Sequence, residues 1–243
     1  MGSGLESMFK KPARWLAAAS LLSLAWIAFS AKAAAEDDVV FYIDDVEFLD
    51  LAGMAGILVR NGASFTLLKV PFGRASHLLD TDTPGCGFIL SKDVPGRSDY
   101  HWLAPTLLAN VVIATSDPAH PEPQAGDAVA TYGAQGLLSI LAEYGYQPLL
   151  YRSTAQAAKL LETGRTRFIV GIEPTLWPVE KAFGHPLATI KALHPVNVWL
   201  GCNKATPAEA AHSIGRAWQA GVSSGDIQKI YESAGILRFL PEQ

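Results

Sequence analysis

Motifs for metal, nucleotide and thiol redox chemistry are missing from this sequence. There is no CxxC, no HExxH and no P-loop, and the six histidines do not recur at metal-ligand spacing. Gly221 to Gly225 matches G-x-S-x-G, but a nucleophile elbow needs a strand-to-helix turn, and this stretch is predicted to join two helices. We therefore expect no metal, no cofactor and no catalytic nucleophile, and predict that the chain is not an enzyme.

The chain also lacks an excess of basic residues. Lys and Arg number 19 against 23 Asp and Glu, which gives a formal net charge of −4. Without residues 1–35 the chain loses four cations and one anion, so its charge becomes −7. A mildly acidic chain binds nucleic acid and anionic membranes poorly, so neither is expected as a partner.

Cysteine is scarce as well. Cys86 and Cys202 are the only two, and they lie far apart in the sequence. In an oxidising compartment they could form one disulfide. Their number and spacing are equally compatible with two buried free thiols, so both interpretations stay open.

The N-terminal residues have the pattern of a secretory signal. Lys10, Lys11 and Arg14 precede an uncharged apolar run from Trp15 to Ala31, and an A-x-A pattern follows. This predicts a signal peptide over residues 1–35, cleaved near Ala35, and hence a periplasmic protein. A membrane anchor is the alternative, but the apolar run is near the short limit for spanning a bilayer.

The rest of the chain reads as one β-α-β-α-β scheme used twice. Apolar runs predict buried strands and amphipathic spacing predicts helices, and a Pro-rich polar loop over 116–127 separates the two sets. The predicted strands are 39–43, 65–70, 87–90, 128–131, 148–151, 168–171 and 196–201. The predicted helices are 49–60, 72–79, 135–144, 154–163, a broken helix at 174–183, 207–220 and 224–234. The scheme predicts two α/β lobes with a cleft between them.

Several ordered segments carry a family resemblance. They are VVFYIDD, VPFGRASHLLDTDTPGCGFIL, GRSDYHWLAP, YRSTAQAAKLLETGRTRFIVG and the C-terminal stretch that begins VNVWLGCNKA. In this order they resemble the periplasmic solute-binding proteins of the polar amino-acid type (extracellular solute-binding family 3, a type II periplasmic-binding fold). The resemblance covers about residues 38–237.

The resemblance implies a fold and a division of the chain. The fold class is α/β, with two doubly wound α/β lobes joined by a two-strand hinge and a ligand cleft between them. Residues 36–112 and 197–243 would form lobe one, and residues 113–196 lobe two. The third strand and the return strand are neighbours in such a fold, which would bring Cys86 close to Cys202. A monomer is expected, with an inner-membrane ABC permease as its partner.

The resemblance also implies a binding site. Arg97 stands where the family places an arginine that grips the α-carboxylate of the ligand, and the first helix of lobe two would add backbone N–H groups. Tyr42 or Phe72 would be a stacking platform, and Asp44 a partner for a cation. The ligand-binding residues expected in this way are Arg97, Tyr42, Asp44, Phe72, Ser91, Lys92, Tyr132, Gly133, Gln135, Gly136 and Glu173.

The chain departs from the family pattern at informative positions. The family's lobe-two carboxylate, which holds the α-ammonium of the ligand, falls on Ile172, and Glu173 one residue later could replace it. Lys92, beside Ser91, stands where a small hydroxyl residue is usual, which favours a more anionic ligand than a plain amino acid. The loop after the first strand is short and leaves Tyr42, Asp44, Glu47 and Phe48 as its candidates for ligand contact.

The function expected from these features is capture of a small carboxylate-bearing solute, amino-acid-like or an organic acid, for an ABC transporter. Two alternatives remain open. One is an accessory protein of the same fold that docks a partner and transports no solute. The other is a lyase of the cyclohexadienyl dehydratase type, with Glu173 as general acid.

Overall fold

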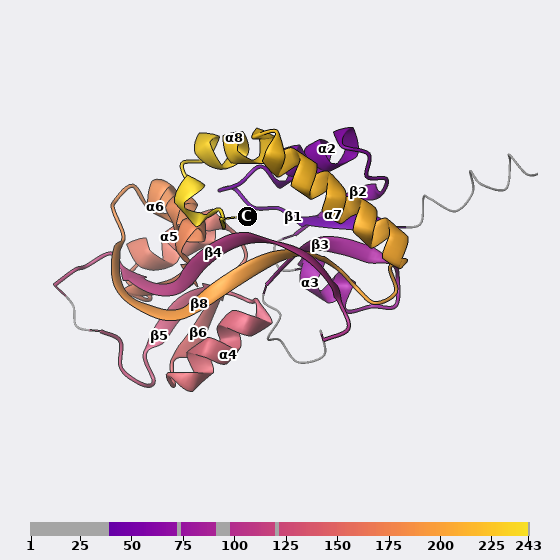
Figure 1. Ribbon diagram of the computed structural model, residues 1–243. Helices are drawn as coiled ribbons and strands as arrows, with labels where there is room; N and C mark the ends of the chain where they lie inside the picture. The colour runs from indigo at the N-terminus through magenta and orange to yellow at the C-terminus, as the bar shows by residue number, and fades with distance from the viewer. Residues whose placement is uncertain (1–38, 72–73, 91–97, 120–121, 243) are drawn as a thin grey trace, which may run out of the picture. The chain divides into compact units, whose positions relative to one another are not determined.

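The computed structural model describes residues 39–71, 74–90, 98–119 and 122–242, which form an eight-stranded mixed sheet with helices packed on it (Figure 1). The strand order is β2-β1-β3-β8-β4-β7-β5-β6. None of the helices in these ranges combines the length and the apolar character that crossing a membrane requires.

The first half of the sheet is a parallel β-α-β-α-β unit. β1 lies between β2 and β3 and pairs with both in parallel. Phe41 of β1 packs on Phe88 with ring centroids 5.6 Å apart, whereas its neighbour Tyr42 joins a separate apolar cluster with Leu79. Successive side chains of a strand point to opposite faces, so both faces of β1 are covered. The elements are β1 (Val40–Asp44), α2 (Leu51–Arg60), β2 (Thr66–Val70), α3 (Arg74–Leu79) and β3 (Gly85–Leu90).

The second half repeats the scheme. β5 lies between β6 and β7 and is parallel to both, and every residue of β7 is buried. Ser153 accepts a hydrogen bond from the backbone N–H of Gln156 and so caps one of the helices. The elements are β5 (Ala128–Tyr132), α4 (Gln135–Glu143), β6 (Gln147–Tyr151), α5 (Thr154–Glu162), β7 (Phe168–Ile172), η1 (Glu173–Leu176) and α6 (Trp177–Phe183).

Two long antiparallel strands connect the halves. β4 (His101–Thr115) and β8 (Ala188–Cys202) have 15 residues each and pair from His101 opposite Cys202 to Thr115 opposite Ala188. The sequence prediction of a strand at 196–201 was too short. Residues 188–195 are half-buried or exposed, and polar residues and Pro195 interrupt their apolar side chains, so no apolar run indicates a strand there. Their pairing with β4 makes them part of β8.

The C-terminal helices cover the first half of the sheet (Figure 1). They are α7 (Ala208–Ser223) and α8 (Asp226–Ser233), followed by the turn η2 (Leu237–Phe239). Trp218 of α7 is fully buried, and the Tyr231 hydroxyl of α8 donates a hydrogen bond to the backbone carbonyl of Thr106. The Trp218 ring packs on Phe88 of β3 at 6.2 Å between centroids, and the Tyr231 hydrogen bond holds α8 to β4. Exposing the buried indole, or leaving the buried carbonyl without its hydrogen bond, would cost stability.

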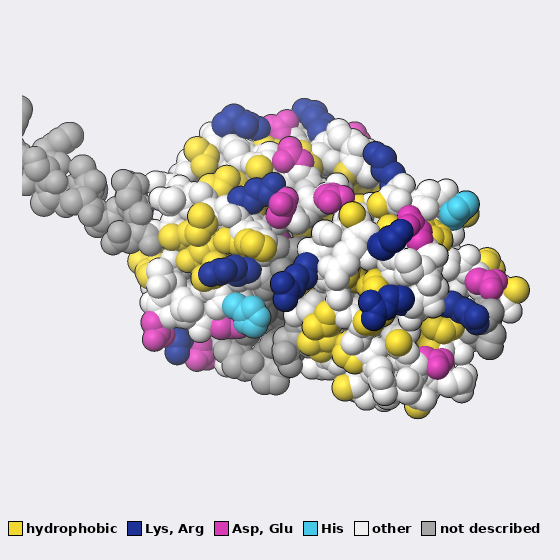
Figure 2. All heavy atoms as spheres, turned by 180° about the vertical axis from the view of Figure 1, so that it is seen from behind, with side chains coloured by type: hydrophobic (Ala, Val, Ile, Leu, Met, Phe, Trp, Pro, Cys, Tyr) yellow, Lys and Arg dark blue, Asp and Glu magenta, His cyan; other side chains and the backbone are white. Residues whose placement is uncertain are grey.

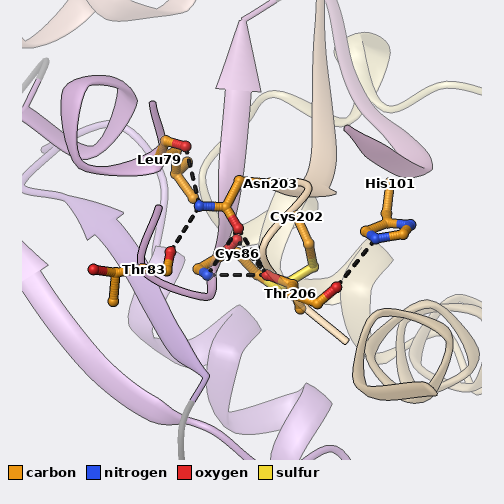
Figure 3. The surroundings of a disulfide bond; sticks show 8 residues. Leu79, Thr83, Cys86, His101, Cys202, Asn203 and Thr206 are labelled. Atoms are coloured by element: carbon orange, nitrogen blue, oxygen red, sulfur yellow. Dashed lines mark hydrogen bonds between the residues drawn. A yellow bond between two sulfur atoms is a disulfide. The ribbon is translucent and has the colours of Figure 1, made fainter. Parts of the chain in front are cut away.

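A disulfide joins β3 to β8. Cys86 and Cys202 stand opposite each other in the antiparallel register, and their sulfur atoms are 2.03 Å apart (Figure 3). Beside it, the Asn203 amide nitrogen donates to the backbone carbonyls of Leu79, Thr81 and Thr83 at 2.7–3.2 Å. The covalent bond therefore holds β3 to β8, and the three hydrogen bonds hold the chain between α3 and β3 to the residue that follows β8.

Charges of both signs are mixed on the surface of the protein. On the face drawn in Figure 2, Lys and Arg side chains alternate with Asp and Glu side chains and do not gather into one basic patch. Some charges of the protein pair across the chain, as the side chains of Lys191 and Glu122 do at 3.2 Å. The described side chains of this face offer no continuous basic surface for nucleic acid.

Candidate functional site

A cavity of about 220 Å³ is lined by residues from both halves of the sheet. Its walls are mostly apolar, with a small number of polar groups, as is usual for small-molecule sites. The first half and the C-terminal helices contribute Tyr42, Asp44, Val46, Phe48, Leu49, Leu51, Met54, Ser76, His77, Asp80, Phe88 and Tyr231. The second half contributes Tyr132, Ala134, Gly136, Ile172 and Thr175, and the long strands Thr106, Leu107 and Val198.

Asp44 and Asp80 bring two carboxylates to this cavity. Asp44 ends β1 and accepts a hydrogen bond from the backbone N–H of Ala75 at 3.1 Å, in the first turn of α3. Asp80 follows α3 and accepts a hydrogen bond from the Tyr100 hydroxyl at 2.6 Å. Hydrogen bonds to a carboxylate favour its charged form, so both groups add negative charge to the cavity.

Tyr132 forms part of the opposite wall. It ends β5, is 6% exposed, and its ring packs edge-on against Tyr151 at 6.0 Å between centroids. Burial raises the pKa of Tyr132 well above the usual range of a phenol. The nearby Tyr151 side chain and the Asp44 carboxylate raise the pKa of Tyr132 further, because they disfavour a phenolate beside them. Tyr132 is therefore a neutral phenol, and the Asp44 charge acts across the cavity on it.

Tyr42 reaches the cavity because glycines give it room. A Cβ atom at Gly85 would lie 2.8 Å from Cε2 of the Tyr42 ring, and one at Gly87 would lie 2.7 Å from its backbone carbonyl oxygen. Tyr42 is 5% exposed and packs on Val70 and Leu79. The ring is thus fixed by packing, which suits a wall that a ligand contacts.

The N-terminus of α4 meets the cavity. Ala134 is the N-cap residue and makes no side-chain capping bond, and both Ala134 and Gly136 line the cavity. The first turn of a helix carries backbone N–H groups without helical partners, which attract anions. Gly133 precedes the cap and is not among the lining residues, and Gln135 is the first residue of the helix.

Glu173 lies away from the cavity lining. It begins η1, and its carboxylate accepts a hydrogen bond from the Arg238 guanidinium at 2.8 Å. Arg238 also stacks over the rings of Trp177 and Phe239 at 5.8 and 4.7 Å from their centroids. The turn of η1 directs the side chain to this cation, so Glu173 is an ion-pair partner in the structure.

The structure thus brings together five of the residues expected from the sequence, namely Tyr42, Asp44, Phe48, Tyr132 and Gly136, whereas Glu47 is not among the lining residues. Phe72, Ser91, Lys92 and Arg97 lie outside the described residues. Within the described ranges, no group of His, Cys, Asp and Glu side chains is arranged to hold a metal ion.

Sequence reasoning missed the polar residues that α3 and the long strand supply. Ser76 and Asp80 are spaced by four residues and His77 and Asp80 by three, so they share one side of the α3 segment. That spacing could have suggested a polar face turned toward a ligand. For Thr106, the only indication in the sequence is that a single hydroxyl residue stands within an apolar run.

No protein-family model matches this chain, and no curated protein matches its sequence. Solved structures do match its fold. A putative L-cystine ABC transporter protein from Listeria monocytogenes has 15% identity and a TM-score of 0.68, over 86% of this chain and 100% of that one. The amino-acid ABC transporter substrate-binding protein AbpA from Streptococcus pneumoniae, bound to L-arginine, has 13% identity and a TM-score of 0.65, over 88% and 100%.

A third match is the GluR0 ligand-binding core from Nostoc punctiforme in complex with L-glutamate, with 15% identity and a TM-score of 0.63, over 82% of this chain and 98% of that one. Identities this low show the fold alone. The predicted fold class is confirmed by these matches: the chain has the two-lobed α/β architecture of the type II periplasmic-binding fold.

Proposed function

We propose that this protein is a periplasmic solute-binding protein that captures a small carboxylate-bearing solute and delivers it to an ABC permease in the inner membrane. One observation carries the proposal. The cavity takes its walls from two α/β halves that are connected mainly through β4 and β8. Such an arrangement lets a solute between the halves favour the closed state, because it contacts both walls only when they approach.

The similar structures support this proposal. Two of them are ABC transporter proteins, and two contain a bound amino acid, L-arginine or L-glutamate. We propose residues 36–112 and 197–243 as lobe one and residues 113–196 as lobe two, with β4 and β8 as the hinge. The protein would act as a monomer.

The carboxylate of the solute would be held at the N-terminus of α4. Ala134 and Gly136 line the cavity there, and helix N-terminal N–H groups bind anions. Arg97 would complete the grip, because a planar guanidinium pairs with a carboxylate through two parallel hydrogen bonds. Gly133 and Gln135 would shape this helix start, and Phe72, Ser91 and Lys92 would complete the wall.

A periplasmic location agrees with two features. The predicted signal peptide over residues 1–35 directs export, and the disulfide between Cys86 and Cys202 is of a kind that persists in oxidising compartments.

Thermal unfolding tests the proposal. The protein without residues 1–35 is screened against amino acids, dicarboxylates and aromatic acids, and a bound solute should raise Tm in a concentration-dependent way. Arg97→Ala should abolish the rise. Arg216→Ala should leave it unchanged, because Arg216 is exposed on α7. If no compound of any class raises Tm and a stable complex with a partner protein forms instead, the accessory role replaces solute capture.

Nothing described favours the lyase alternative. That role requires Glu173 as a general acid in the cavity, and the Glu173 carboxylate is paired with Arg238 outside the lining. Product formation from prephenate or arogenate would reverse this conclusion.

A further inference from the structure

The C-terminal segment that follows α8 reaches the second half of the sheet. Gly235 ends α8 with a φ of 70°, a left-handed conformation that glycine adopts without strain. The backbone N–H of Ile236 then donates to the carbonyl of Tyr231 at 2.9 Å. This reversal brings η2 to η1, where Arg238 pairs with Glu173 at 2.8 Å. The two halves of the sheet are therefore in contact at a place that does not belong to β4 or β8.

The buried part of this contact is aromatic. The Phe239 ring lies 6.1 Å from the Trp177 ring, measured between centroids, and Phe239 is 5% exposed. Aromatic pairs at this spacing attract each other beyond the gain from removing their surface from water. The ion pair between Arg238 and Glu173 is largely solvated and adds little. The strength of the contact therefore depends on the two rings.

The turn η1 contributes both to the cavity and to the contact with the C-terminal segment. Ile172, at the end of β7, and Thr175 line the cavity, and the Thr175 hydroxyl donates to the backbone carbonyl of Ile172 at 2.8 Å. Glu173 and Trp177, two residues before and after Thr175, contact the C-terminal segment instead. The position of this wall of the cavity therefore depends on contacts that the C-terminal segment makes.

The helix before the C-terminal segment is itself fixed at the cavity. Tyr231 of α8 lines the cavity, and its hydroxyl donates a hydrogen bond to the backbone carbonyl of Thr106 in β4. Because α8 is held to β4 in this way, η2 has a firm base from which to contact η1. The stretch from Tyr231 to Phe239 thus connects a lobe-one wall of the cavity, the long strand β4 and a lobe-two wall.

We propose that Phe239 and Trp177 form a clasp between the lobes, which holds the lobe-two wall in position and so sets the affinity for the solute without contacting it. The lobes and the solute are those of the proposed function, on which this inference rests in part. Neither residue lines the cavity, whereas both halves do in this arrangement. Loosening the clasp adds arrangements in which a solute contacts one wall only. The apparent affinity then falls with the fraction of molecules that stay binding-competent.

Titration calorimetry with a solute found in the thermal screen measures the effect on affinity. Phe239→Ala and Trp177→Ala should each weaken binding about fivefold, whatever the chemistry of the solute. The double variant should bind about as tightly as either single variant, since all three lack the same contact. Phe183→Ala is the matched control and should leave the affinity unchanged. Phe183 lies on the same helix, α6, and its ring packs on that of His185 at 5.3 Å between centroids.

Spin labels measure the arrangement of the lobes without any solute. Asp82→Cys and Glu143→Cys place labels at exposed positions of the first and the second half, and the native cysteines do not react because they form a disulfide. Phe239→Ala should broaden the distribution of distances between the labels, whereas Phe183→Ala should leave it as narrow as in the parent protein. Phe239→Leu, which keeps most of the apolar volume, replaces Phe239→Ala where urea unfolding shows that the alanine variant does not fold.

The results distinguish the clasp from the proposed function. If a solute binds and Phe239→Ala changes neither its affinity nor the label distances, the clasp is wrong while solute capture stands. A change in only one of the two measurements overturns the clasp as well, because it predicts both. Tighter binding in the variant would also overturn it, since the contact would then oppose the binding-competent arrangement. If no compound of the screen binds but the distances broaden, solute capture fails and the contact still holds the lobes.

Discussion

The carboxylate of Glu173 and the guanidinium of Arg238 are joined by a hydrogen bond of 2.8 Å that ties the turn after β7 to the C-terminal η2. The Arg238 side chain is 64% exposed and that of Glu173 is 29% exposed. Solvent screens such a pair, so its contribution to stability is small. Its main effect is to hold the Glu173 carboxylate, which belongs to the second half of the sheet, away from the cavity lining.

Glu173→Gln should therefore leave solute binding intact. We expect its free energy of unfolding to change by less than about 1 kcal/mol, because the pair is largely solvated. Arg238→Ala should cost more, about 1 kcal/mol, since it also removes the stacking on Trp177 and Phe239. Urea unfolding measures the change of stability, and titration calorimetry with a solute found in the thermal screen measures the change of affinity. A loss of affinity of about tenfold in Glu173→Gln would show instead that the Glu173 carboxylate binds the ammonium group of the solute.

The disulfide should be a major source of stability. Cys86 and Cys202 are 116 residues apart in the sequence, and cross-linking a long loop restricts the unfolded chain strongly. Replacing both cysteines by alanine should lower the free energy of unfolding by about 3–5 kcal/mol. Dithiothreitol should produce the same loss in the unmodified protein and none in the double variant. Two titratable thiols in the unreduced protein would contradict this expectation.

Regular apolar patterns made much of the fold predictable. The run FIVGI predicted the strand Phe168–Ile172, and all five residues are buried in β7. The first part of β8 was not predicted, because it has no continuous apolar run. Its side chains are half-buried or exposed, and it carries Pro195, so only pairing with β4 reveals it as a strand.

The sequence predicts those cavity residues that stand at the ends of parallel strands, because the order of strands and helices along the chain places these ends together. Tyr42 and Asp44 end the first strand, and Tyr132 ends the strand before α4, so the ends of parallel strands meet at the cavity. Asp80 and Thr175 depend on how α3 and η1 pack against other elements, which no local pattern encodes. Glu173 was expected at the site from its position beside Ile172, but a single turn of η1 sends its side chain to Arg238.

Gly87 should tolerate no side chain. A Cβ atom there would lie 2.7 Å from the backbone carbonyl oxygen of Tyr42, which cannot move without shifting β1 against β3. Gly87→Ala should cost about 1–3 kcal/mol of stability and weaken solute binding, since Tyr42 lines the cavity. Gly133→Ala is the control, because a Cβ atom at Gly133 would have no described neighbour within 4 Å. Equal stability of the two variants in urea would show that β1 and β3 can separate freely.

Stability should fall at alkaline pH because of buried tyrosines. Burial raises the pKa of Tyr132, Tyr151 and Tyr231 above the unfolded value near 10. Below pH 10 each phenol is neutral in both states, so its contribution is complete. Above pH 10 the unfolded chain loses these protons while the folded chain keeps them, so stability declines toward the raised folded pKa.

Each such tyrosine lowers the free energy of unfolding by about 1.4 kcal/mol per pH unit once the unfolded phenol is ionised. Urea midpoints measured at about pH 8, 10 and 11 should therefore stay level to about pH 9.5 and then drop. Tyr132→Phe removes one ionisable group and should make the decline shallower by that amount. Tyr144→Phe is the comparison, since Tyr144 is only half-buried at the C-terminal cap of α4. A decline of unchanged steepness in Tyr132→Phe would mean that Tyr132 ionises in the folded protein as readily as in water.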